Sequence, residues 1–234
     1  MENKSGCLVC GKDIIYREED DELKCYYCGK IIKSNVMCED GHFVCDLCHS
    51  SSANDLIERF STSSALKDPI EMALVLMRSP KVRMHGPEHH FLLPAVLLSC
   101  YYNIKGDKES KKDAIAKARN RAEKILGGFC GSHGNCGAAV GAGIFISLIT
   151  KATPLSDEEW RLSNLITSNS LRAIAGVGGP RCCKRDTFLS IIEAVDFLRD
   201  NFGVVMDIKK DSLRCEFSSQ NKECLGEFCP FFGD

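Results

Sequence analysis

The sequence predicts a mainly α-helical protein with a small metal-binding module at its N-terminal end. Two observations lead to this fold class. Seven of the fifteen cysteines fall within the first 49 residues, mostly in closely spaced pairs. Residues 55 to about 203 instead carry a series of helix start and stop signals. We therefore expect a zinc-binding module at residues 1–52 and a helical domain at residues 53–234, ending in a short β-hairpin and a cysteine-rich tail.

The helical region is divided by clear boundary signals. Asp68 and Pro69 place an acidic cap before a first-turn proline, which predicts a helix over residues 68–79. Similar signals predict helices over 87–102, 110–126 and 156–175, and from Asp186 or Thr187 to about 201. Two apolar segments around a polar turn, Val204–Ile208 and Leu213–Phe217, are predicted to pair as strands.

Composition narrows the classes of function. The formal net charge of -2 gives no general argument for binding nucleic acid or an anionic membrane. The first residues contain no apolar run, and the most apolar stretch, residues 137–149, is short and glycine-rich, so neither a secretory signal nor a spanning helix is predicted. We expect a cytoplasmic protein. Because disulfides are disfavoured there, fifteen cysteines indicate metal binding or redox chemistry.

The N-terminal module offers four pairs of metal ligands. They are Cys7 and Cys10, Cys25 and Cys28, Cys38 and His42, and Cys45 and Cys48. Eight such ligands suit two tetrahedral structural zinc ions. Gly11 and Gly29 follow the first two pairs, where glycine lets the backbone turn under a metal. Sequential pairing would give a zinc ribbon and cross-brace pairing would interleave the pairs; the spacing leaves both open.

Residues 38–48 of this module resemble the middle of RING-type and treble-clef fingers. The third ligand of a RING finger is normally single, whereas Cys25 and Cys28 form a pair, so ubiquitin-ligase activity is not expected. Basic residues and tyrosines are present, but the acidic run Glu18–Glu22 would repel phosphates. We expect the module to dock a protein partner rather than nucleic acid.

A histidine-rich segment opens the helix expected from residue 87. It contains His85, Glu88, His89 and His90. Histidine and carboxylate side chains suit zinc, iron or manganese, so these four are candidate metal ligands. Adjacent histidines point about 100° apart on a helix, so only one of His89 and His90 is expected to share a site with His85. The alternative is a capped helix start with one buried histidine.

Two glycine-rich loops carry a second cysteine system. The first contains Cys130, His133 and Cys136, and the second contains Arg181, Cys182, Cys183 and Arg185. Both precede helices, whose N-terminal dipoles favour thiolates. Convergence of the loops would give an iron–sulfur cluster site or a redox-active thiol site; the alternative is two loops with incidental buried cysteines. The tail adds Cys215, Cys224 and Cys229, and three ligands require a fourth from the helical region or leave an open position.

Three motifs together support a resemblance. The strings HGPEHH, FCGSHGNCG and GPRCCKR resemble an uncharacterised family of anaerobic archaea and bacteria. Some of its members are similar to C-terminal extensions of methyltransferases that depend on S-adenosylmethionine. The resemblance implies a methyltransferase as one candidate partner, but no activity. The sequence itself lacks a strand followed by a glycine-rich nucleotide-binding turn.

These features lead to two hypotheses. The first is a metalloprotein whose Cys/His centre performs redox, sulfur or metal-assisted chemistry on a small anionic substrate. Cys182 or Cys183 would act as thiolate or cluster ligand, His133 or His89 would move a proton, and Arg181 or Arg185 would hold the anion. The second hypothesis is a non-catalytic adaptor, or a metal or sulfur carrier, for another enzyme. Whether the protein is an enzyme stays open.

Overall fold

The computed structural model describes residues 7–45, 48 and 52–233. The N-terminal module is built on one antiparallel hairpin of β1 (Ile14–Lys24) and β2 (Ile31–Cys38). Its register is interrupted by a bulge between Tyr16 and Asp21, within the acidic run. Ser50 and Ser51, at the expected exit from the module, lie outside the described residues.

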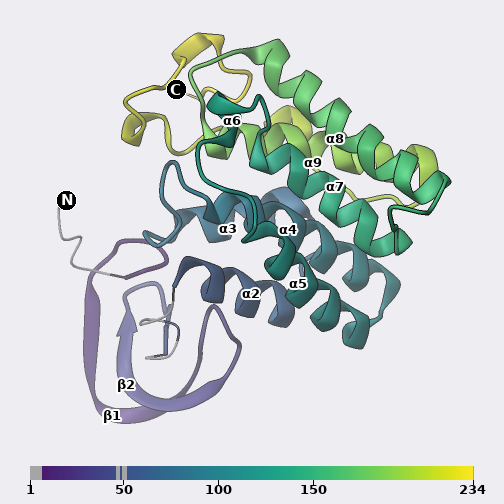
Figure 1. Cartoon of the computed structure of the whole chain (residues 1–234). Helices are drawn as coiled ribbons and strands as arrows, with labels where there is room; N and C mark the ends of the chain where they lie inside the picture. Colours follow the sequence, from purple (N-terminus) through teal and green to yellow (C-terminus); the bar gives the residue numbers. More distant parts are fainter. Residues whose placement is uncertain (1–6, 46–47, 49–51, 234) are drawn as a thin grey trace.

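Helices make up most of the remaining chain and confirm the mainly α fold class (Figure 1). They are α2 (Ala53–Ser63), α3 (Pro69–Arg78), α4 (Glu88–Lys105), α5 (Lys108–Ala122), α6 (Phe129–Ser132), α7 (Gly137–Thr150), α8 (Glu158–Val177) and α9 (Cys183–Phe202). Asp68 caps α3 as expected, since its carboxylate accepts hydrogen bonds from the backbone N–H groups of Ile70 and Glu71. Helix α9 begins three residues before Asp186, because Cys182 takes the N-cap position.

Helix α4 lies at the centre of the helical domain. Its residues 91–100 are all buried, and it contacts α2, α3, α5, α7 and α9. Glycines on α7 let it approach closely: a Cβ on Gly137 would lie 2.0 Å from the His90 ring, and one on Gly141 would lie 2.9 Å from Pro94. The small residues of α7 thus form a face on which α4 packs closely. No helix in the described part of the chain is long and apolar enough to cross a membrane.

The metal-binding module packs against α2. Tyr26 stacks on Phe60, with ring centroids 6.2 Å apart, and Tyr27 meets the same ring edge-on. The Ser63 hydroxyl donates a hydrogen bond to the backbone carbonyl of Tyr27 at 3.0 Å. Tyr27 is almost fully buried and belongs to the same continuous core as Leu56 of α2. The module is therefore seated on the helical domain through aromatic contacts.

The prediction of a C-terminal β-hairpin was wrong. Within the described residues the only strands are β1 and β2, and residues 204–217 form extended chain and a short 3-10 turn. Val204, Met206, Leu213 and Phe217 are buried in the helical core. Alternating burial thus reflects extended chain packed on helices rather than strands paired with each other. Two more 3-10 turns, Ser218–Gln220 and Gly226–Phe228, complete the tail.

Candidate metal centres

The first metal-binding group joins the first and third ligand pairs. Cys7, Cys10, Cys38 and His42 have ligand atoms that all lie within 4.8 Å of one another. The Cys10 and Cys38 sulfurs are 3.8 Å apart, and the Cys38 sulfur lies 3.4 Å from His42 Nδ1. These separations match ligands around one tetrahedral ion with metal–sulfur bonds of about 2.3 Å.

The second group joins the remaining two pairs. Cys25, Cys28, Cys45 and Cys48 meet the same 4.8 Å criterion, and the Cys28 and Cys45 sulfurs are 3.7 Å apart. The backbone N–H of Cys45 points at the Cys25 sulfur, at 3.4 Å. Gly29 follows with φ +70°, and its N–H donates to the Cys25 carbonyl. The turn under the second pair therefore uses a conformation that favours glycine.

The two groups interleave along the chain, so the module has cross-brace pairing. The hairpin explains why: β2 returns beside β1, which brings Cys38 back to the residues that precede β1. Both groups could each hold one metal ion, with four protein ligands and no position left for substrate. Apart from Cys10, their cysteines are buried or half-buried. The module is built for structural metals.

The histidine-rich segment does not converge on one point. His85 Nε2 lies 3.0 Å from the Asn221 side-chain oxygen, and His90 Nδ1 lies 3.2 Å from the Ile125 carbonyl. His89 Nε2 contacts the Arg83 carbonyl at 3.0 Å, and the Glu88 carboxylate accepts from the Arg83 N–H. Burial lowers the pKa of His89 to about 3. The structure thus gives each of the four side chains a separate partner, and their ligand roles stay a prediction.

The same segment lies beside the other cysteines. The His85 ring is within hydrogen-bond distance of Asn221, and Asn221 lines a pocket formed by the tail. Gly86, one residue on, directs its backbone N–H at the Cys183 sulfur. The ring of His90 packs on Gly137, the first residue of α7. The histidine segment therefore contacts the tail, the start of α9 and the start of α7, all of which carry cysteines. The motif alone did not indicate this positioning role.

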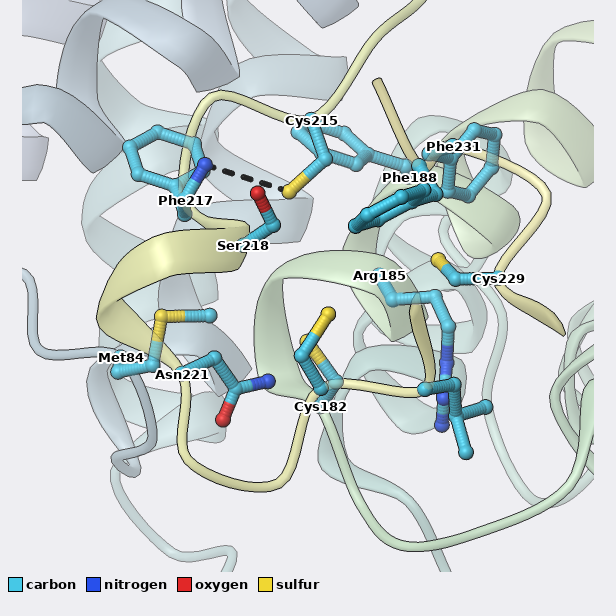
Figure 2. A pocket seen from close by; sticks show the side chains of 13 residues that line it. Met84, Cys182, Arg185, Phe188, Cys215, Phe217, Ser218, Asn221, Cys229 and Phe231 are labelled. Carbon is cyan, nitrogen blue, oxygen red and sulfur yellow. Dashed lines mark hydrogen bonds between the residues drawn. The ribbon is translucent and has the colours of Figure 1, made fainter. Parts of the chain in front are cut away.

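Four cysteines from two distant parts of the chain line one pocket, here called the tail pocket. They are Cys182, at the start of α9, and Cys215, Cys224 and Cys229 of the tail. The sulfurs of Cys182, Cys215 and Cys229 point toward the space between them, with Phe188 and Phe231 along one wall (Figure 2). Its free volume is about 20 Å³, so a group larger than a water molecule would have to displace the side chains that line it. Cys182 of the helical region thus lies at the same pocket as the three tail cysteines, whose role as ligands stays a prediction.

Hydrogen-bond donors and cations surround the tail pocket. The backbone N–H of Phe217 points at the Cys215 sulfur and that of Gly226 at the Cys224 sulfur, each at 3.4 Å. Lys184 is only 2% exposed; its ammonium donates to the Met77 carbonyl and lies 4.0 Å above the Phe217 ring. Burial lowers the pKa of Lys184 to about 8, while nearby thiols act to raise it. The pocket is therefore prepared for negative charge.

Residues of both glycine-rich loops line a second site, here called the loop cleft. It has a volume of about 710 Å³. Cys130 and Cys136 line it from the first loop, and Arg181 lines it from the second, together with Arg185 and Asp186 of α9. The loops do not gather all four cysteines in one place, because Cys182 lines the tail pocket instead.

The residues expected to move protons or hold an anion have different environments. The Arg185 guanidinium donates hydrogen bonds to the carbonyls of Gly178 and Pro180 and forms an ion pair with Asp186. Arg185 therefore holds the second loop in place. Arg181 is exposed at the cleft, with no hydrogen bond or ion pair to the described residues. His133 is exposed, and its ring contacts Ser132 and Phe129. Of the two arginines, Arg181 is the one free to bind an anion.

Sequence reasoning missed two residues at these sites, Asp186 and Asn221, and it did not predict the burial of a third, Lys184. Lys184 and Asp186 are buried charged residues beside the cysteines, and Asn221 links the tail pocket to His85. Lys184 lies in the motif GPRCCKR, but its burial depends on how α9 packs. Asn221 lies in a polar turn that has no distinctive pattern, so no local signal could have identified it.

Comparison with known proteins gives the family but no activity. A family model described as "Family of unknown function (DUF5714)" matches residues 57–232. The match spans the helical domain and the tail, including both cysteine sites. No curated protein and no solved structure matches the chain. Because the match covers well over half of its length, the chain belongs to the DUF5714 family of unknown function.

Proposed function

We propose that this protein is an iron–sulfur protein whose tail pocket holds a [4Fe–4S] cluster through Cys182, Cys215, Cys224 and Cys229. The observation that carries the proposal is the meeting of four thiols around one pocket, three from the tail and one from the start of α9. Four cysteine thiolates are the usual ligand set of such clusters.

The spacing of the sulfurs favours a cluster over a single ion. No three of the four tail-pocket sulfurs lie within 4.8 Å of one another, whereas the two groups of the N-terminal module meet that limit. A tetrahedral ion with bonds of about 2.3 Å draws its sulfurs to within about 4 Å of each other. A [4Fe–4S] cluster keeps its thiolates farther apart, because each binds a different iron.

Electrostatics supports the same assignment. A cluster with four thiolates carries net negative charge, and the pocket offers the Lys184 ammonium and the N-terminal end of α9. Lys184 has no carboxylate within ion-pair distance in the described part of the chain. The Glu88 carboxylate raises the pKa of Lys184 without forming an ion pair with it, and a cluster would add negative charge beside this buried ammonium.

The metals of the N-terminal module are, in this proposal, two zinc ions with a structural role. Sulfur and histidine ligands at tetrahedral spacing support zinc, and each site has four ligands of its own. Redox or metal-assisted chemistry on a small anionic substrate would then belong to the helical domain, with Arg181 as the anion-holding residue. A reducing, cytoplasmic setting is part of the proposal.

A second candidate function is an adaptor that delivers the cluster or its electrons to a partner protein. The hairpin favours it, because Tyr16 is 75% exposed and Ile31 is 65% exposed on a module with closed metal sites. Nearby acidic residues of β1 suit a partner with a basic surface. A methyltransferase as that partner stays a prediction from the resemblance.

Anaerobic purification followed by iron, sulfide and zinc analysis tests the proposal. We expect inorganic sulfide and the broad visible absorbance of thiolate-bound iron, with loss of iron in a Cys224→Ala variant. Cys100→Ala is the matched control, since Cys100 is a fully buried thiol of α4 that lines neither pocket. Zinc alone in the anaerobic, sulfide-reconstituted protein, or equal iron in both variants, would refute the cluster.

A further inference from the structure

Three thiols remain in the helical domain once Cys182 is assigned to the tail pocket and Cys100 to the core. These are Cys130, Cys136 and Cys183. Residues three apart on a helix share a face, so Cys183 shares the face of Asp186 on α9. Asp186 lines the loop cleft, and its carboxylate lies 3.8 Å from the Cys136 sulfur. The neighbouring cysteines 182 and 183 are thereby divided between two sites.

Two of these thiols line the loop cleft, and the third, Cys183, lies three residues before Asp186, which also lines it. Cys130 lies in α6 and Cys136 caps α7, and both line the cleft; Cys183 is the first residue of α9. Burial raises the pKa of Cys183, and the backbone N–H of Gly86 and the charge of Arg181 oppose that rise. Burial likewise raises the pKa of Cys136 to about 12, against hydrogen bonds from Ala138 and Ala139. Backbone N–H groups aimed at sulfur are what a metal-bound thiolate accepts.

The buried carboxylate of Asp186 is also unusual. It is 4% exposed, and burial raises its pKa although Arg185 lies 3.2 Å away. Arg185 also donates hydrogen bonds to two backbone carbonyls, so Asp186 is not its only partner. One Asp186 oxygen faces Arg185 and the other faces the Cys136 thiol.

We propose that Cys130, Cys136 and Cys183 hold a second iron–sulfur cluster, one iron of which faces the loop cleft and is open to a small anionic ligand. Three thiolates leave one iron of a [4Fe–4S] cluster without a cysteine. The cleft gives that iron room, and Arg181, which is unpaired among the described residues, stands at its wall to hold the anion. No three of these ligand atoms lie within 4.8 Å, which again favours a cluster over one ion.

The second cluster shares no cysteine with the first, so the two assignments stand or fall separately. The test compares neighbouring alanine variants after anaerobic reconstitution with iron and sulfide. Wild-type protein is expected to bind about eight irons per chain, four for each [4Fe–4S] cluster. Cys182→Ala and Cys183→Ala should each retain about half of that iron, and the double variant almost none.

Cys100→Ala serves as the control and should retain all the iron, and far-ultraviolet circular dichroism checks that each variant is folded. Cys130→Ala must behave like Cys183→Ala, because both remove the cleft cluster. Malonate, a small dianion, should change the electron paramagnetic resonance spectrum of reduced Cys182→Ala protein and leave that of Cys183→Ala unchanged. Full iron in Cys183→Ala and Cys130→Ala overturns the second cluster alone; full iron in Cys182→Ala overturns only the first.

Discussion

The Cys10 sulfur lies 3.8 Å from the Cys38 sulfur, although 28 residues separate the two in the sequence. This contact defines the cross-brace of the N-terminal module. It predicts that Cys10→Ala and Cys38→Ala remove the same ion, so each lowers zinc content from about two to about one per chain. The double variant Cys10→Ala/Cys38→Ala should still hold about one zinc.

Inductively coupled plasma mass spectrometry of the variants checks this expectation. The informative control is Cys10→Ala/Cys28→Ala, which damages both interleaved sites and should hold no zinc. Sequential pairing would reverse the two double variants, leaving one zinc in Cys10→Ala/Cys28→Ala and none in Cys10→Ala/Cys38→Ala.

Stability should fall in mild acid because of His89. Burial lowers its pKa to about 3 in the folded chain, whereas an unfolded histidine titrates near 6.5. The unfolded state therefore binds more protons below pH 6.5, and stability is lost as pH falls through that window. The loss due to His89 should reach about 2 kcal/mol at pH 5, since each pH unit between the two pKa values contributes about 1.4 kcal/mol.

A His89→Gln variant should show a flatter stability profile between pH 7 and 5, measured by urea unfolding. Glutamine keeps a donor for the Arg83 carbonyl but has no proton to gain. His133→Gln, at an exposed histidine, should leave the profile unchanged. An equally steep profile in His89→Gln would show that other groups cause the acid sensitivity.

The contact between α4 and α7 makes Gly137 intolerant of substitution. An alanine Cβ there would lie 2.0 Å from the ring of His90, which is itself held by the Ile125 carbonyl. We expect Gly137→Ala to cost about 3 kcal/mol, the upper part of the range for overpacking. Thermal unfolding measures the change.

Gly176→Ala in α8 is the matched comparison. No atom beyond the neighbouring helix backbone lies within 4 Å of the added Cβ, and the residue is the penultimate one of α8. Alanine there should stabilise the protein by about 0.5–1 kcal/mol. Similar effects of the two substitutions would argue against the close packing of α7 on His90.

Lys184 is expected to matter for the proposed cluster more than for the fold. Lys184→Met removes a buried positive charge beside the tail pocket, so the cluster should become harder to reduce and should lose iron sooner. Lys111→Met is the control, because Lys111 is also buried but contacts Ser64 and Asn103. Protein-film voltammetry measures the reduction potential, and a time course measures the release of iron. An unchanged potential in Lys184→Met would show that Lys184 does not act on the cluster.

The helices were predictable because their signals are local. Asp68 caps α3 through its own carboxylate, as predicted, whereas α4 runs past the predicted end at residue 102 to Gly106, which has φ +74°. The hairpin of β1 and β2 was not predicted, since nearly all of β1 is exposed and its acidic run hides any alternation. The segment from Val204 was mistaken for a strand because extended chain on a helical core buries alternate residues too.

The sequence likewise predicts some features of the metal-binding residues and not others. The eight ligands of the module are close in sequence and were identified as a set, although their pairing required the hairpin. The separation of Cys182 from Cys183 could not be read from the sequence. It depends on which face of α9 each residue occupies and on how the tail returns to that helix.

The tail pocket also sets an order of events during synthesis. Cys182 is made 47 residues before Cys229, so the four cysteines of the tail pocket are present together only after Cys229 has been translated. The N-terminal module, by contrast, has all of its ligands once Cys48 has been made. Its metals can therefore be acquired on the ribosome, whereas assembly at the tail pocket is a late step in maturation.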